Sequence, residues 1–172
     1  MNLPSVLLLS VLGALVAAGC GPSPSWVRSL DAATSLSVSE GLPHQVREAD
    51  LLEQEQQRTD TTMLGGFHFY TPPVTVDGAR MKQLKTVLGD GDRFFTRGGV
   101  PSDCGPFHPD YAVQWMEGAR TQQLLVCFTC QEVWRVSEGE RDEFGFRSIE
   151  DLKSLLLEYS SKRPNVGTIP GK

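Results

Sequence analysis

The sequence has little of what marks the commonest functional classes. Of its 172 residues, 16 are Lys or Arg and 21 are Asp or Glu, so the formal net charge is -5. No run of basic residues offsets this acidic balance, which argues against a nucleic-acid-binding protein. The sequence also has no P-loop, no H-E-x-x-H, no G-x-G-x-x-G and no nucleophile elbow, so no familiar catalytic motif favours an enzyme.

Long apolar segments are also scarce. The most apolar stretch, residues 6–18, is uncharged and reads VLLLSVLGALVAA. It is too short to cross about 30 Å of hydrocarbon comfortably, but it has the length of the apolar region of a signal peptide. The sequence therefore predicts export rather than a membrane-spanning helix.

Small residues and a cysteine close this apolar segment. Ala17, Ala18, Gly19 and Cys20 resemble a bacterial lipobox, in which the cysteine is diacylated and becomes the mature N-terminus. This predicts a signal peptide over residues 1–19 and a lipid anchor on Cys20, with each buried CH₂ contributing roughly 0.8 kcal/mol to membrane binding. Ala17 stands where Leu is usual, and no Lys or Arg precedes the apolar segment.

Two alternatives to the lipid anchor stay open. One is an ordinary secretory signal cleaved nearby, which would leave Cys20 as an unmodified thiol, and the other is an uncleaved N-terminal helix. Gly21, rather than Asp, follows the cysteine. By analogy with enteric sorting, this predicts a bacterial envelope protein held at the outer membrane.

The composition after Cys20 predicts a tether. Residues 21–25 read Gly-Pro-Ser-Pro-Ser, which holds neither a helix nor a strand. Residues 45–58 have a weak helical pattern, but a run of Glu and Gln makes that helix mostly polar. We therefore expect a flexible, partly helical tether over residues 20–63.

The remaining residues, 64–172, have the pattern of one α+β domain. Asp77 is placed to cap a helix over residues 78–88, and residues 149–159 have the apolar periodicity of a second helix. Residues 111–116 alternate as a strand does. We expect an antiparallel sheet of three to five strands covered by two helices.

The longest β pattern covers residues 122–136. It exceeds the usual strand length of about 5–6 residues, which predicts a bend, bulge or hairpin near Cys130 and Gln131. In a straight strand Cys127 and Cys130 would point to opposite faces of the sheet.

Three cysteines and one histidine form a candidate metal site. Cys104, His108, Cys127 and Cys130 have the composition of a tetrahedral zinc site, with a C-x₂-C half. Four protein ligands would leave no open position for a substrate, so zinc here would be structural.

A disulfide competes with the zinc site. Thiols tend to pair in an oxidising exported compartment, and Cys104 is placed to bridge either Cys127 or Cys130. The crosslink would close a loop of some two dozen residues and contribute about 3 kcal/mol in the chain-entropy model. A redox C-x-x-C is disfavoured because the motif lies in a β pattern rather than at a helix start. A c-type haem site is excluded because Gln131 stands where the axial His is needed.

Two motifs together resemble an uncharacterised family of small bacterial exported proteins and lipoproteins. Residues 104–109 follow its C-x-P-x-H pattern, and residues 127–130 follow its C-F-x-C pattern, after which comes a C-terminal helix. The resemblance covers residues 64–160, with Pro109 standing where the family has Gly. It implies that the Cys and His residues belong together and implies nothing about a substrate.

The sequence therefore favours a membrane-tethered, non-enzymatic binding or structural domain of the cell envelope. Its partner through the anchor is the membrane, and the sequence names no protein partner. The alternatives are a thiol-dependent envelope redox protein that uses Cys127 or Cys130, and a metal-handling lipoprotein in which the ion is cargo. A reactive, exposed thiol of low pKa would favour the redox alternative.

Overall fold

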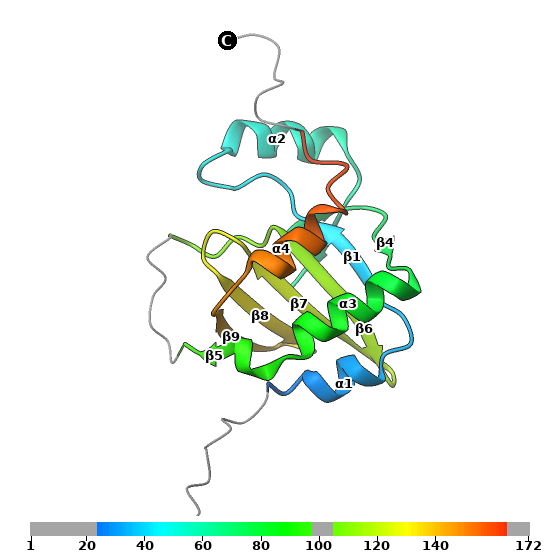
Figure 1. Ribbon diagram of the computed structural model, residues 1–172. Helices are drawn as coiled ribbons and strands as arrows, with labels where there is room; N and C mark the ends of the chain where they lie inside the picture. The colour runs from blue at the N-terminus through cyan, green and yellow to red at the C-terminus, as the bar shows by residue number, and fades with distance from the viewer. Residues whose placement is uncertain (1–23, 98–104, 165–172) are drawn as a thin grey trace, which may run out of the picture.

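The computed structural model describes residues 24–97 and 105–164 and has an α+β fold built on an antiparallel sheet (Figure 1). Within these residues the sheet has seven strands in the order β4-β1-β6-β7-β8-β9-β5, and a separate hairpin pairs β2 with β3. The strands are β1 (Ser37–Glu40), β2 (Thr61–Leu64), β3 (Phe67–Tyr70), β4 (Val74–Thr75), β5 (Phe94–Thr96), β6 (Tyr111–Glu117), β7 (Arg120–Cys127), β8 (Glu132–Ser137) and β9 (Glu140–Phe146). The helices are α1 (Val27–Ala32), α2 (Ala49–Arg58), α3 (Gly78–Gly89) and α4 (Glu150–Leu157), with a 3-10 turn η1 (Gly91–Arg93).

The two faces of the sheet have different covers. Helices α1, α3 and α4 lie over one face (Figure 1), where Leu30, Leu84 and Leu152 pack with apolar residues of β6 and β7. The β2–β3 hairpin contributes Leu64 and Phe69 to a smaller apolar cluster on the other face. The larger core is therefore a sheet covered by helices, which confirms the α+β prediction, although three helices cover it rather than the two expected.

The expected three to five strands are too few. Two of the additional strands, β1 and β4, are only 4 and 2 residues long. The sequence did not predict them because such short segments give no period-two pattern. Strand β9 was also missed, because Glu140–Phe146 reads ERDEFGF and has none of the β-branched residues typical of strands. Its pairing with β8 comes from the hairpin rather than from intrinsic preference.

The predicted tether is folded from Pro24 onward, so the boundary near residue 64 is wrong. Trp26 is 1% exposed, and its indole N–H donates to the carbonyl of Leu88 at 3.0 Å. Strand β1 lies inside the sheet, between β4 and β6. A few large apolar residues spaced among Ser and Ala give too little periodicity to predict this from the sequence. The predicted signal peptide, 1–19, and Cys20 lie outside the described residues.

The hairpin predicted within residues 122–136 is confirmed, since β7 and β8 pair as antiparallel neighbours. Residues 128–131 make the turn, in which Gln131 has a positive φ of 51° and its N–H donates to the carbonyl of Phe128 at 3.3 Å. Even-numbered side chains therefore lie on different faces of the sheet before and after the turn. Leu124 packs with the helices, whereas Trp134 packs on the hairpin side, where it pairs with Leu125. This turn places Cys127 and Cys130 together at one end of the sheet.

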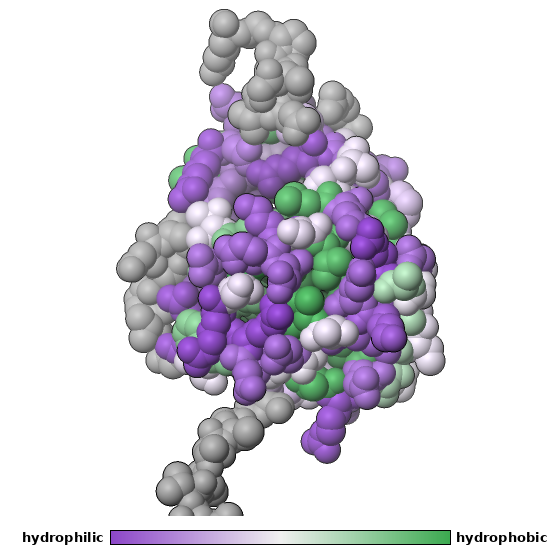
Figure 2. Space-filling model, viewed as in Figure 1, coloured by the Kyte–Doolittle hydropathy of each residue, from purple (hydrophilic) through white to green (hydrophobic). Residues whose placement is uncertain are grey.

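Helix α3 begins as the sequence predicts. One carboxylate oxygen of Asp77 accepts from the N–H groups of Ala79 and Arg80, both at 2.9 Å, and so satisfies two free donors of the first turn. Figure 2 shows apolar side chains in a band between mostly hydrophilic surfaces on the face where α3 and α4 lie. Among the described residues, no helix has the length and apolar character needed to cross a membrane.

Candidate binding site

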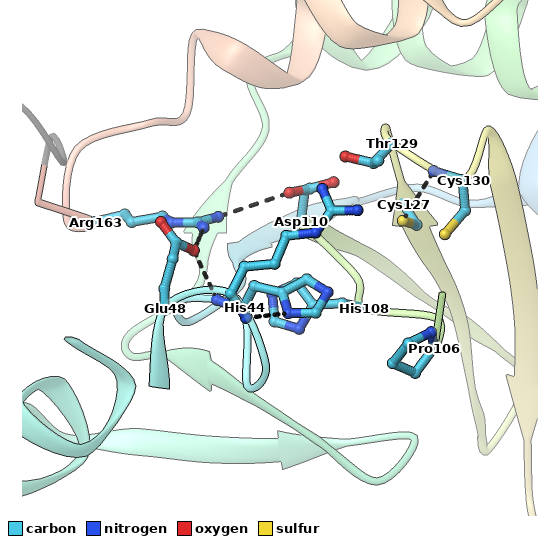
Figure 3. Close-up of a pocket in the computed structure, with 10 residues that line it drawn as sticks. His44, Glu48, Pro106, His108, Asp110, Cys127, Thr129, Cys130 and Arg163 are labelled. Carbon is cyan, nitrogen blue, oxygen red and sulfur yellow. Dashed lines mark hydrogen bonds and ion pairs between the residues drawn. The ribbon is translucent and has the colours of Figure 1, made fainter. Parts of the chain in front are cut away.

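A cavity of about 280 Å³ lies at the end of the sheet where β6 begins and β7 ends (Figure 3). Its lining comes from the segment before α2, the segment before β6, the β7–β8 turn and the residues after α4. The residues are His44, Arg47, Glu48, Pro106, His108, Asp110, Cys127, Thr129, Cys130 and Arg163. Parts of the chain as far apart as residues 44 and 163 therefore meet here.

His108 is fixed in the wall of the cavity by one hydrogen bond. The residue is buried, and its Nε2 lies 2.9 Å from the carbonyl oxygen of Leu42. Because a carbonyl oxygen only accepts, Nε2 carries the proton and donates. The neutral ring then keeps Nδ1 as an acceptor.

His44 lies against His108, with 4.6 Å between the ring centroids. Its Nδ1 accepts from the backbone N–H groups of Val46 and Arg47 at 3.0 and 3.2 Å. Its own backbone N–H donates to Glu48 Oε2 at 2.8 Å. These contacts order the turn that leads into α2 and hold both imidazoles at the cavity.

Both imidazoles are uncharged near neutral pH. Burial, followed by the neighbouring His44, lowers the pKa of His108 from 6.5 to about 4. Burial and then Arg47 lower the pKa of His44. The pair therefore offers hydrogen-bonding groups rather than positive charge.

Arg163 bridges two carboxylates at the back of the cavity. Its guanidinium contacts Glu48 Oε2 closely and lies 3.6 Å from Asp110 Oδ1. Asp110 Oδ2 accepts from the N–H of Phe128 at 2.7 Å, which ties the β7–β8 turn to this network. Burial raises the pKa of Asp110. Burial also raises the pKa of Glu48, but the N–H of His44 and the charge of Arg163 outweigh it, so the net pKa is lowered.

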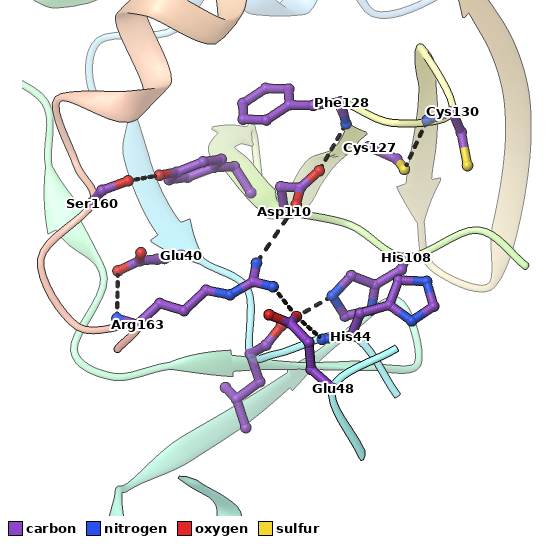
Figure 4. Close-up of polar contacts among 12 residues, drawn as sticks. Glu40, His44, Glu48, His108, Asp110, Cys127, Phe128, Cys130, Ser160 and Arg163 are labelled. Carbon is purple, nitrogen blue, oxygen red and sulfur yellow. Dashed lines mark hydrogen bonds and ion pairs between the residues drawn. The ribbon is translucent and has the colours of Figure 1, made fainter. Parts of the chain in front are cut away.

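Residues 160–163, which we call the C-terminal strap, are fixed by a buried carboxylate (Figure 4). Glu40 Oε2 accepts from the N–H groups of Ser161, Lys162 and Arg163 at 3.1, 2.9 and 3.3 Å. A second cavity of about 250 Å³ is lined by Glu40 and also by Glu48, Asp110 and Arg163. Glu48, Asp110 and Arg163 therefore line both cavities.

The two described cysteines differ in chemical state. Cys127 is a free thiol, 2% exposed, and its Sγ accepts from the N–H of Cys130 at 3.3 Å. Burial raises the pKa of the Cys127 thiol, and N–H groups of Cys130 and His108 offset only part of this. Cys130 is disulfide-bonded.

The predicted metal and disulfide residues come together only in part. His108, Cys127 and Cys130 line one cavity, whereas Cys104 lies outside the described residues. Residues 24–97 and 105–164 contain no group of three or more His, Cys, Asp or Glu side chains arranged to hold a metal ion. A sulfur in a disulfide is not a thiolate, so Cys130 in this state does not supply the fourth ligand of the zinc site.

Several residues of the cavity were not singled out from the sequence. His44 reads as a solvated histidine, and Glu48, Asp110 and Arg163 read as ordinary charged residues. The spacing of His44 and Glu48, four residues apart before a helical pattern, is the one local signal that pairs them. The approach of Arg163 depends on the path of the chain after α4, which has no local signature.

Comparisons with protein-family models, with curated proteins and with solved structures found no match to this chain. The resemblance carried by residues 104–130 therefore stays a prediction.

Proposed function

We propose that this chain is a bacterial envelope lipoprotein, acylated on Cys20, whose α+β domain is a non-enzymatic binding domain. The apolar segment over residues 6–18 and the small residues before Cys20 support the anchor and the export. The cavity between α2, the β7–β8 turn and the C-terminal strap supports binding. The outer membrane is the proposed location, because Gly21 rather than Asp follows the cysteine.

One observation carries the binding function: the cavity contains a thiol and an imidazole that would be catalytic elsewhere, but burial favours the neutral form of both. Burial raises the pKa of the Cys127 thiol, whereas an attacking cysteine needs a lowered one. His108, with a pKa of about 4, is a poor base near neutral pH. Neutral, fixed side chains suit recognition better than proton transfer.

The cavity favours a small, polar ligand. About 280 Å³ is near the lower end of ligand pockets, which run from roughly 300 to 1,000 Å³. His108 Nδ1 is an acceptor and the hydroxyl of Thr129 both donates and accepts. Arg163 is engaged by two carboxylates, so its charge is already balanced. These groups fit an uncharged hydrogen-bonding molecule better than an anion.

The disulfide at Cys130 is proposed to be a staple with Cys104. Of the four cysteines, Cys127 is a free thiol and Cys20 is the proposed acylation site, which leaves Cys104 as the partner. The crosslink would hold the loop after β5 to the β7–β8 turn and contribute about 3 kcal/mol in the chain-entropy model. Zinc is not needed for this role.

Two measurements test the proposal. In bacteria that express the full chain, globomycin-type inhibition of lipoprotein processing should make the uncleaved precursor accumulate, and Cys20→Ser should prevent both acylation and cleavage before residue 20. Unchanged processing in both cases would remove the anchor.

The non-enzymatic assignment is tested with a bulky maleimide. The native protein should stay unlabelled, and one thiol should react after unfolding in urea. Met116→Cys, which adds a thiol at a 52% exposed position, shows that the reagent works on the folded chain. Rapid labelling of Cys127 in the native protein would instead support a thiol-dependent function.

That thiol-dependent redox function is the second candidate, and one contact favours it. Cys127 is a free thiol whose sulfur touches the backbone of a disulfide-bonded cysteine three residues away. Thiol–disulfide exchange needs such a neighbour, but it also needs access and thiolate character. The burial and raised pKa of Cys127 place this candidate second. The metal-handling alternative has no comparable contact among the described residues.

A further inference from the structure

We propose that the α1 end of the domain faces the bilayer and the cavity end points away from it. This orientation rests on the proposed acylation of Cys20 and adds a membrane-facing surface to it. The surface is formed by the outer side of α1 and by the β6–β7 turn, which together line a shallow depression. Its residues are Ser25, Arg28, Ser29, Ala32, Met116, Glu117 and Gly118.

The short connection to the anchor is the first argument. The described chain begins at Pro24, which is buried, and the carbonyl of Pro24 accepts from the N–H of Val27 at 3.1 Å. Only residues 21–23 separate Pro24 from Cys20. Fully extended, the chain from Cys20 to Pro24 spans at most about 14 Å. The long tether expected from the sequence would have left the orientation free, whereas this connection does not.

The firm seating of the first residues is the second argument. Trp26 packs edge-on against Phe94 and Phe144, with ring centroids 4.9 and 4.7 Å apart. Ser25 Oγ accepts from Arg135 Nη1 at 2.8 Å, which binds the start of the chain to β8. The anchor is thus joined to a rigid part of the sheet rather than to a loose segment.

The cavity lies at the opposite end of the same strands. Asp110 comes directly before β6 and Cys127 ends β7, whereas the β6–β7 turn next to Ser25 joins their other ends. At about 3.3 Å per residue, the seven residues of β6 separate the two ends by about 20 Å. Figure 1 shows α1 at one end of the molecule and α2 at the other. An inverted domain would need a longer connection than Cys20 has.

Charge disfavours the orientation in which α2 faces the membrane. An anionic bilayer repels the exposed Asp50 and Glu53 of α2. The α1 end carries charges of both signs, among them Arg28, Arg120 and Glu138, of which Arg120 and Glu138 form an ion pair. The half-exposed Met116 adds an apolar side chain at that end.

The orientation is tested with the full-length, acylated protein in vesicles of phosphatidylethanolamine and phosphatidylglycerol that contain a headgroup nitroxide lipid. A fluorophore is attached at Met116→Cys in one sample and at Val46→Cys in the other. The two sites are matched, since both side chains are apolar, 52% and 66% exposed, and at opposite ends of the domain. Cys127 is buried and serves as the unlabelled background.

We expect the nitroxide to quench the fluorophore at 116 several-fold more than the one at 46. An insertion of about twenty Gly and Ser residues between Gly21 and Pro22 should bring quenching at 116 down to that at 46, because the longer chain frees the domain. Equal quenching at the two sites of the acylated protein, or stronger quenching at 46, would overturn the orientation and leave the anchor in place. An intact mass without acyl chains would overturn the proposed anchor itself.

Discussion

The pH dependence of stability near His108 can be worked out from the structure. Burial and the adjacent His44 lower the pKa of His108 from 6.5 to about 4. As pH falls below 6.5, the unfolded chain binds a proton that the folded chain does not, so the free energy of unfolding decreases. Between about pH 7 and about pH 5 the free energy of unfolding falls by about 2 kcal/mol on the full pKa difference. Because solvent reaches the ring and screens its charge, we expect a decrease of about 1–2 kcal/mol.

The groups around His108 modify this dependence but do not reverse its sign. The pKa of His44 is also lowered, so it destabilises the folded chain in the same direction as acid is added. The pKa of Asp110 is raised, so its protonation in the folded state offsets part of the loss. The nearby guanidinium of Arg163 disfavours a protonated His108.

His108→Gln isolates the contribution of the ring. The glutamine amide supplies a donor for the carbonyl of Leu42 and does not titrate in this range. Urea unfolding of the Cys20→Ser protein, with and without His108→Gln, measures the free energy at each pH. The protein with His108 should lose about 1–2 kcal/mol more than the Gln variant between about pH 7 and about pH 5. Equal losses in the two proteins would refute the argument from burial.

Three substitutions test other parts of the account. Trp26→Ala should lower the free energy of unfolding by about 3–5 kcal/mol in a urea titration, because the ring is buried in the main core. An unchanged midpoint would mean that residues 24–63 are a tether and not part of the folded domain. Glu40→Gln should cost about 2–3 kcal/mol and loosen the C-terminal strap in hydrogen exchange, since a charged acceptor of three N–H groups is lost; full protection of residues 161–163 would argue against that role. Asp77→Ala should cost about 1 kcal/mol in thermal unfolding through loss of the α3 cap, and no change in the midpoint would contradict it.

Much of the fold could be predicted where the signal is local. Asp77 and the apolar spacing behind it predict α3 because a cap and one buried face lie within a dozen residues. The alternation of Tyr111, Val113 and Trp115 predicts β6, and all three side chains lie in the helix-covered core. The excess length of the next β pattern predicts the hairpin at residues 128–131, which the structure has.

The elements that were missed are held by contacts distant in sequence. Strand β1 reads Ser-Val-Ser-Glu and is a strand because β4 and β6 pair with its two edges. Helix α1 has 6 residues, fewer than two turns, and depends on Trp26 and Leu30 packing against α3 and the sheet. No short window of the sequence carries this information.

The sequence likewise predicted one part of the candidate site and missed the other. Two motifs predict that His108, Cys127 and Cys130 belong together, and these three residues share one cavity. His44, Glu48 and Arg163 reach that cavity only through the turn before α2 and the path after α4. Their role as fixed neighbours depends on burial and on the carboxylate of Glu40, neither of which the sequence displays.

The intact mass of the protein extracted from its native membrane tests the central claim most directly. We predict a chain that begins at Cys20, carries acyl chains and is two hydrogens lighter than the fully reduced form. A chain that begins elsewhere and carries no acyl group would contradict the anchor, and the full complement of thiol hydrogens would contradict the disulfide at Cys130.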